Sequence, residues 1–138
     1  MRWSFGCLAA IVAAAATSSA AAQSSQPGRS TTAGVYTDEQ ASRGKDTYAM
    51  QCKSCHTPAS HTGATFAQWW NKKPLSELFL FITTKMPKNE PGSLQPDEYA
   101  DLVAYLLKMN EMPSGTEALP ADSMALRKIR IETVRKDP

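Results

Sequence analysis

The sequence predicts a mainly α-helical fold, and three observations support this expectation. The segments 37–52 and 95–109 carry apolar residues at the spacing of one helical face. A third segment, 75–83, is apolar nearly all round, which is typical of a buried helix. Only 128–132 alternates like a strand, and an isolated strand needs a partner.

The first helix begins with a recognisable N-cap. Thr37 can cap it, and Gln40 stands three residues later as the partner of a capping box. Gly44, Tyr48 and Cys52 recur every four residues and therefore share one face. Gly44 costs about 1 kcal/mol relative to Ala in a helix interior. This cost predicts that another backbone comes close at Gly44.

The other two helices are bounded by proline and by a C-cap. Pro74 suits the first position of the second helix, and Pro96 suits that of the third. Asn110 can cap the end of the third helix. The segments 58–68 and 85–94 contain turn-forming residues and predict loops.

Residues 1–22 predict a secretory signal peptide. Arg2 gives a positive start, 8–16 is a short Ala-rich apolar run, and 20–22 is a small-residue cleavage site. The run is shorter than the roughly 20 apolar residues that span a bilayer, although an uncleaved anchor is the alternative. We therefore expect a periplasmic or secreted protein with no membrane span after cleavage.

Three segments follow the signal peptide. We expect a flexible leader over 23–36, because it is rich in Ser, Thr, Gly and Gln. The globular domain covers 37–113, and 114–138 is a C-terminal extension that either docks a partner or wraps its own domain. The formal net charge of +2 is too small to indicate a nucleic-acid-binding protein.

Cys52, Cys55 and His56 form a C-x-x-C-H pattern, which is typical of haem attachment. Two cysteines one helical turn apart can each form a thioether with a vinyl group on one porphyrin edge. His56 is then placed to bind the iron, as histidine commonly does in haem proteins. Cys7 leaves with the signal peptide, so these two are the cysteines of the mature chain.

Other interpretations of the two cysteines remain open. A thioredoxin-type redox pair needs a βαβ context, which the pattern does not predict. A zinc site needs two further ligands, and only His61 remains among the histidines. A structural disulfide would leave the position of His56 unexplained.

Met86 is the candidate for the second axial ligand of the iron. It stands in a loop beside Pro87, so no helical stripe explains it, and its thioether is a soft ligand suited to haem iron. Two alternatives remain: Met86 fills a gap in the core, or His61 is the ligand. His61 follows His56 by only five residues, a short path around a haem edge.

Aromatic and basic residues surround these candidate ligands. Trp69 or Trp70 could donate an indole N–H to a haem propionate, or both could serve packing and surface roles. Four apolar residues are expected to line the haem: Phe66, Phe79, Phe81 and Ile82. Five lysines could form a basic rim that attracts an acidic redox partner: Lys53, Lys72, Lys73, Lys85 and Lys88. Glu77 and Glu90 dilute this charge, so an ordinary solvated surface is the alternative.

The segment 37–113 resembles the class I (monohaem, His/Met) cytochromes c. The resemblance is carried by Gly44 and Tyr48 ahead of the C-x-x-C-H motif, by Lys85-Met86-Pro87, and by 102–107. It implies a compact cytochrome c fold of three or more helices around one covalent haem c per chain. It also implies His/Met axial ligation and a close crossing of the first and last helices near Gly44 and Tyr105.

The segments 86–94 and 113–120 are similar, more specifically, to small cytochromes associated with quinoprotein alcohol dehydrogenases. This resemblance implies redox partner proteins, with a dehydrogenase as donor and an oxidase or other acceptor. The expected function is one-electron transfer and not enzyme catalysis, since a haem enzyme needs an open iron position and an acid–base residue. A haem subunit of a larger dehydrogenase is a further interpretation.

Overall fold

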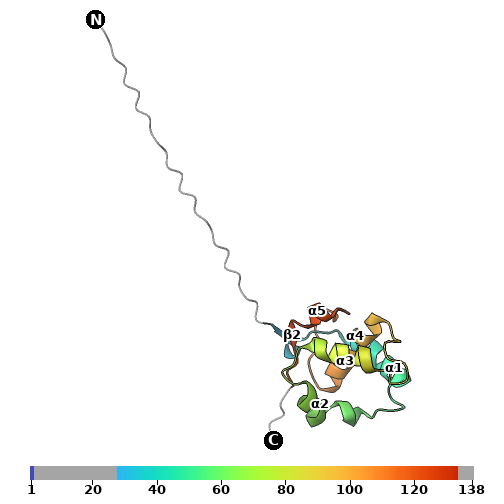
Figure 1. The fold of residues 1–138 in the computed structure, drawn as a ribbon. Helices are drawn as coiled ribbons and strands as arrows, with labels where there is room; N and C mark the ends of the chain where they lie inside the picture. The colour runs from blue at the N-terminus through green and yellow to red at the C-terminus, as the bar shows by residue number, and fades with distance from the viewer. Residues whose placement is uncertain (2–27, 134–138) are drawn as a thin grey trace.

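The computed structural model describes residue 1 and residues 28–133, and this part of the chain is mainly helical, as the sequence predicted (Figure 1). Its α-helices are α1 (Asp38–Gln51), α2 (Gly63–Trp70), α3 (Leu75–Lys85), α4 (Pro96–Met109) and α5 (Ser123–Leu126). Two 3-10 turns, η1 (Thr31–Ala33) and η2 (Pro58–His61), and two short strands, β1 (Arg29–Ser30) and β2 (Ile129–Arg130), complete it. The predicted signal peptide, Cys7 included, lies outside the residues described, apart from Met1.

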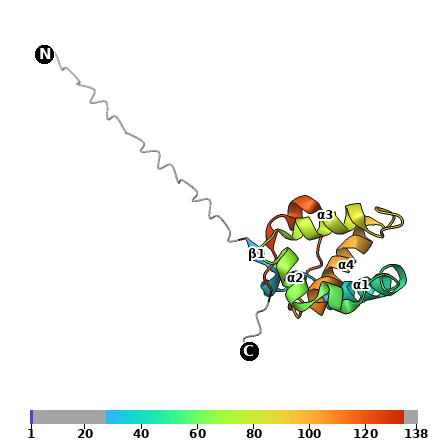
Figure 2. The same cartoon turned by 60° about the horizontal axis from the view of Figure 1, so that its bottom comes forward.

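Helices α1 and α4 pack against each other (Figure 2). Gly44 meets the backbone of Asp101 and Leu102, so closely that a Cβ at this position would overlap the Asp101 carbonyl. Tyr105 lies against Tyr48, with 5.5 Å between ring centroids. The expected crossing is therefore present, and the atoms nearest Gly44 are backbone atoms of α4.

Only one of the two hydrogen bonds of the predicted capping box forms at the N-terminus of α1. The Thr37 hydroxyl accepts a hydrogen bond from the Gln40 amide at 3.1 Å, as expected. The Gln40 side chain, however, is buried and bonds the backbone of Leu119 twice, as donor at 3.0 Å and as acceptor at 2.8 Å. The prediction for Gln40 was wrong because a distant segment competes for its amide.

Helix α4 has the predicted boundaries. Gln95 is its N-cap and forms a capping box with Glu98, Pro96 is its first residue, and Asn110 is its C-cap. Helix α3 begins after Pro74, which is its N-cap, and continues two residues beyond the predicted end.

The prediction of a loop over 58–68 was wrong. This segment contains η2 and most of α2. Phe66 is buried and Trp70 packs partly on the core, one turn further along the same face. The Ser, Thr and Gly residues of this segment suggested a loop, but tertiary packing stabilises a short helix there.

The prediction of a flexible leader over 23–36 was wrong for residues 28–36, which are the part of it that the structure describes. Strand β1 pairs in parallel with β2, with Arg29 opposite Ile129. Tyr36 is fully buried, and its hydroxyl donates a 2.6 Å hydrogen bond to the Met112 carbonyl. Residues 28–36 are therefore part of the folded domain.

The C-terminal extension, as far as residue 133, wraps its own domain. The Lys72 amide donates to the Ile131 carbonyl at 2.7 Å, and the Ile131 amide donates to the Lys73 carbonyl at 2.8 Å. Four apolar residues of the extension are buried in the core: Leu119, Leu126, Ile129 and Ile131. The extension was expected either to dock a partner or to wrap its own domain, and its described part wraps its own domain. We call 119–133 the strap.

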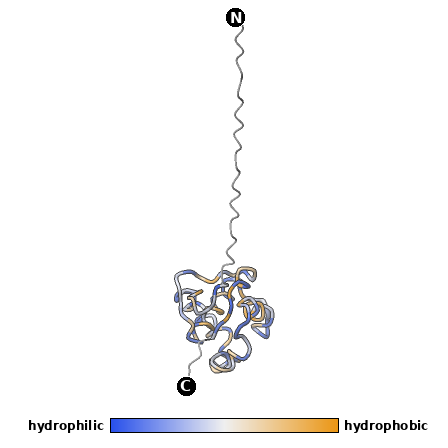
Figure 3. Tube along the Cα trace, turned by 90° about the vertical axis from the view of Figure 1, so that its left-hand side faces the viewer, coloured by the Kyte–Doolittle hydropathy of each residue, from blue (hydrophilic) through white to orange (hydrophobic). Residues whose placement is uncertain are grey.

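Apolar and polar positions are interspersed along the folded chain (Figure 3). The hydrophobic core contains residues from the leader, from the helices and from the strap. Within the described residues, no helix has both the length and the hydropathy needed to cross a membrane.

Candidate functional site

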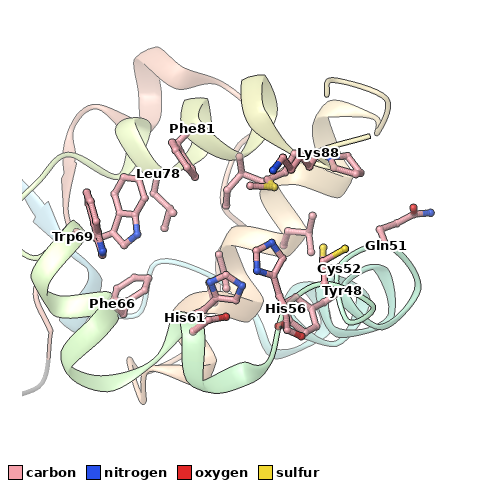
Figure 4. A pocket seen from close by; sticks show the side chains of 18 of the residues that line it. Tyr48, Gln51, Cys52, His56, His61, Phe66, Trp69, Leu78, Phe81 and Lys88 are labelled. Atoms are coloured by element: carbon pink, nitrogen blue, oxygen red, sulfur yellow. Dashed lines mark hydrogen bonds between the residues drawn. The ribbon is translucent and has the colours of Figure 1, made fainter. Parts of the chain in front are cut away.

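A large cavity lies between the end of α1, the η2–α2 segment, α3 and α4 (Figure 4). Its volume is about 1160 Å³, which exceeds the roughly 300–1,000 Å³ of most small-molecule pockets. Much of its wall is apolar, formed by Phe66, Leu78, Phe81, Ile82, Leu102 and Leu106. The cavity therefore suits a large and mostly apolar ligand.

The C-x-x-C-H motif occupies the turn that ends α1. Cys52 is the C-cap of this helix, and its amide donates to the Tyr48 carbonyl at 2.9 Å. The amides of Cys55 and His56 donate in turn to the Cys52 carbonyl, at 3.1 and 2.9 Å. These bonds bring the two thiols and the imidazole to one end of the cavity wall.

The thiol chemistry at this end does not favour a redox pair. Cys52 and Cys55 are both free thiols. Burial, and secondarily the neighbouring Cys55, raises the pKa of the Cys52 thiol. A catalytic C-x-x-C pair depends on a lowered thiol pKa. Burial shifts the pKa of Cys52 in the opposite direction.

His56 points into the cavity from the turn that follows α1 (Figure 4). Its carbonyl accepts a hydrogen bond from the Tyr48 hydroxyl at 3.4 Å, so α1 holds the backbone at this position. Burial, followed by nearby Cys52 and Tyr105, raises the pKa of Tyr48.

His61 lies beside His56 and not across the cavity from it. Their ring centroids are 4.6 Å apart. Metal–imidazole bonds are about 2 Å long, so two imidazoles on opposite sides of one metal have centroids about 6 Å apart. Burial, with His56 as a second cause, lowers the pKa of His61. Asn110 fixes this position by donating to the His61 carbonyl at 2.8 Å.

Met86 lines the same cavity from the C-cap of α3. Its amide donates to the Ile82 carbonyl at 2.9 Å, and its own carbonyl accepts from the Tyr99 hydroxyl at 2.8 Å. The Met86–Pro87 peptide bond is cis. The structure therefore brings together all four residues that the sequence singled out as ligands and attachment points.

Aromatic residues form the end of the cavity away from Cys52 (Figure 4). Trp69 and Trp70 both line it, and Trp70 meets Phe81 edge-on with 5.5 Å between centroids. The ammonium of Lys73 lies 5.4 Å from the centre of the Trp70 ring. Phe79 was wrongly expected here, since it lies on the other side of α3, beside the 92–96 loop.

The five lysines of the predicted basic rim differ in their surroundings. Lys73 and Lys88 line the cavity. Lys72 pairs with Glu132 at 3.1 Å, and Lys73 pairs with Glu77 at 3.5 Å. The positive charge of the rim is therefore partly neutralised by the protein itself.

The donor set of this cavity fits haem. Two thiols can form thioethers, while an imidazole and a thioether are common axial ligands of haem iron. Within residues 28–133, no group of three or more His, Cys, Asp or Glu side chains is placed to hold a metal ion by itself. The apolar wall suits a flat macrocycle.

Comparison with protein families supports the same cofactor. Residues 39–106 match the model of the family described as cytochrome c oxidase, cbb3-type, subunit III. This match supports a c-type cytochrome. It spans the C-x-x-C-H motif and Met86, and it implies haem c and a haem-based role in electron transfer. Comparison with curated proteins and with solved structures gives no match. The association with quinoprotein alcohol dehydrogenases gains no support from these comparisons.

Proposed function

We propose that the protein is an exported one-electron carrier. In this proposal Cys52 and Cys55 attach one haem c covalently, and His56 and Met86 are the axial ligands of its iron. The observation that carries it is that these four side chains line one cavity of a cytochrome c domain. The haem would supply a one-electron iron couple.

The protein's own residues would hold the ligands and exclude water. Backbone bonds fix the turn that carries His56 and the helix end that carries Met86. The apolar wall, with Phe66 and Ile82 buried, would keep the iron environment dry. Methionine ligation and low exposure both raise a haem reduction potential.

The placement of His61 supports a carrier over a haem enzyme. An enzyme of peroxidase type needs an open iron position and an acid–base residue on that side. His61 lies 4.6 Å from the proposed ligand His56. It is therefore poorly placed to act on the side of Met86, and we propose that the protein has no catalytic group.

The proposed location and partners follow from the sequence. The predicted signal peptide supports a location in the periplasm or outside the cell. Its partners would be a dehydrogenase or other donor and a separate acceptor protein. Four apolar residues of the strap are buried in its own domain although Met124 is exposed, and this supports a free carrier over a dehydrogenase subunit that docks through this segment.

Optical spectra of protein produced in a host that attaches haem c test the proposal. Haem that stays with the chain in acid–acetone supports covalent attachment. A far-red methionine–iron band that is lost in Met86→Ala and retained in His61→Ala supports the ligand assignment. High-spin iron in the wild type that binds added ligands freely would overturn the carrier assignment, and loss of haem would overturn the attachment.

A further inference from the structure

We propose that Tyr99 is a positioning residue, whose hydroxyl holds the backbone of Met86 so that its thioether stays on the iron. This inference rests on the proposed function, because it assumes that Met86 is the axial ligand. Tyr99 itself does not line the large cavity. It acts through Met86.

The Tyr99 hydroxyl joins the two ends of the 86–94 segment, which we call the ligand loop. It donates to the Met86 carbonyl at 2.8 Å and accepts from the Leu94 amide at 3.5 Å. The same carbonyl accepts a longer bond, 3.4 Å, from the Gly92 amide. Of the three, the Tyr99–Met86 bond has the shortest distance.

The ligand loop needs such a restraint. Residues 88–93 are all exposed, and the loop's own backbone bonds are short-range, such as those from Glu90 to Pro87 and from Ser93 to Glu90. Within residues 28–133, the side-chain hydrogen bonds that reach this loop come from Tyr99. Exposed loops with few buried contacts open more readily than packed helices.

Tyr99 is itself rigidly held. Its side chain is 1% exposed, and its amide donates to the Gln95 carbonyl in the first turn of α4. Helix α4 packs along α1, the helix that ends in the C-x-x-C-H motif. The elements that carry the two proposed ligands are therefore joined through α4 and the Tyr99 hydroxyl.

Ligand competition in the ferric holoprotein measures this role. Imidazole must displace Met86 to bind, so its apparent affinity reports how firmly Met86 is held. Tyr99→Phe keeps the ring and removes the hydroxyl. We expect imidazole to bind about 3- to 10-fold more tightly, the equilibrium equivalent of one hydrogen bond.

Tyr36→Phe is the matched control. Tyr36 is also 1% exposed, and its hydroxyl also donates to a backbone carbonyl, that of Met112, away from the ligand loop. Both variants should lose similar stability on thermal unfolding, while only Tyr99→Phe should change imidazole affinity. Equal imidazole affinity in Tyr99→Phe and wild type would overturn the positioning role.

Met86→Ala separates the two proposals. If wild type shows the far-red band and Met86→Ala does not, the ligand assignment stands and the Tyr99→Phe result decides the positioning role alone. If wild type binds imidazole as tightly as Met86→Ala, Met86 is not a ligand and both proposals fail.

Discussion

Gly44 of α1 lies directly against the backbone carbonyl of Asp101 of α4. The Asp101 side chain also receives two hydrogen bonds from the guanidinium of Arg43, at 2.8 and 2.9 Å. One residue of α4 therefore meets two successive residues of α1, one through its backbone and one through its carboxylate. This contact sets the distance and the rotation of the helix that ends in the haem-attachment motif.

Gly44→Ala should destabilise the protein even though alanine favours helices. The propensity gain is at most about 1 kcal/mol, whereas a Cβ would overlap a backbone carbonyl that cannot rotate away. Overpacking of this kind costs about 1–3 kcal/mol or more. Because the overlap is with backbone atoms, we take the overpacking cost at about 3 kcal/mol, the upper end of this range. We therefore expect a net loss of about 2 kcal/mol in the free energy of unfolding, measured by denaturant titration of the holoprotein.

Ser42→Ala is the control for this experiment, because Ser42 is exposed on the same helix. It should change the free energy of unfolding by no more than about 0.5 kcal/mol. A Gly44→Ala variant as stable as the wild type would show that α1 and α4 can separate at no cost.

The sequence predicted those features of the fold that depend on neighbouring residues. The Thr37 cap, the Asn110 cap and the boundaries of α4 each depend on residues within one or two turns. The close approach at Gly44 was predicted from the cost of glycine in a helix, although its partner, Asp101, could not be read from the pattern.

Features that depend on distant segments were missed. Arg29 pairs with Ile129, and Gln40 is diverted from its capping box by Leu119. No local pattern near Arg29 or Gln40 could reveal these partners. The polar composition of 23–36 therefore suggested a flexible leader. The chemistry of the candidate site was predictable because Cys52, Cys55 and His56 are adjacent in the sequence. Tyr99 belongs to the apolar face predicted for 95–109, and no local pattern indicated its hydrogen bond to Met86.

Acidification should loosen the strap through Glu132. The Ser30 hydroxyl donates to this carboxylate at 2.7 Å and Lys72 at 3.1 Å, and these bonds, in that order, lower the pKa of Glu132 below its ordinary value of 4.5. A lowered folded-state pKa contributes stability that is present above 4.5 and is lost as the pH falls through the folded value. Glu132→Gln should therefore be less stable than wild type at pH 7, and the difference should vanish in acid.

Thermal unfolding of both proteins between pH 7 and pH 3 measures this difference, and carbon NMR of the Glu132 carboxyl gives its pKa directly. Glu90→Gln, an exposed change in the ligand loop, should leave the unfolding temperature unchanged. A constant difference between Glu132→Gln and wild type at every pH would contradict the assignment of the effect to this carboxylate.

Single replacement of either cysteine should leave one thioether. In Cys55→Ala the exposed thiol is removed and Cys52, the C-cap of α1, still presents its sulfur at the cavity. We expect one covalent bond to haem in Cys55→Ala and in Cys52→Ala, and none when both are replaced. Intact-protein mass spectrometry after acid–acetone extraction measures this. Retention of haem in the double variant would contradict attachment through these two residues.

Lys88 should influence electron transfer more than a lysine remote from the cavity. It lines the cavity and lies in the exposed ligand loop, whereas Lys128 is exposed in the segment after α5 and is absent from the cavity wall. Removing one charge near the site of electron transfer should lower the reaction rate with a small anionic reductant by about 2-fold at low salt. Lys88→Ala should show this decrease, and Lys128→Ala should not.

Because the Debye length shortens to about 3 Å at 1 M salt, the rates of the two variants should converge there. Stopped-flow rates that fall equally in both variants would mean that only the net charge of the protein matters, with no basic rim at the cavity.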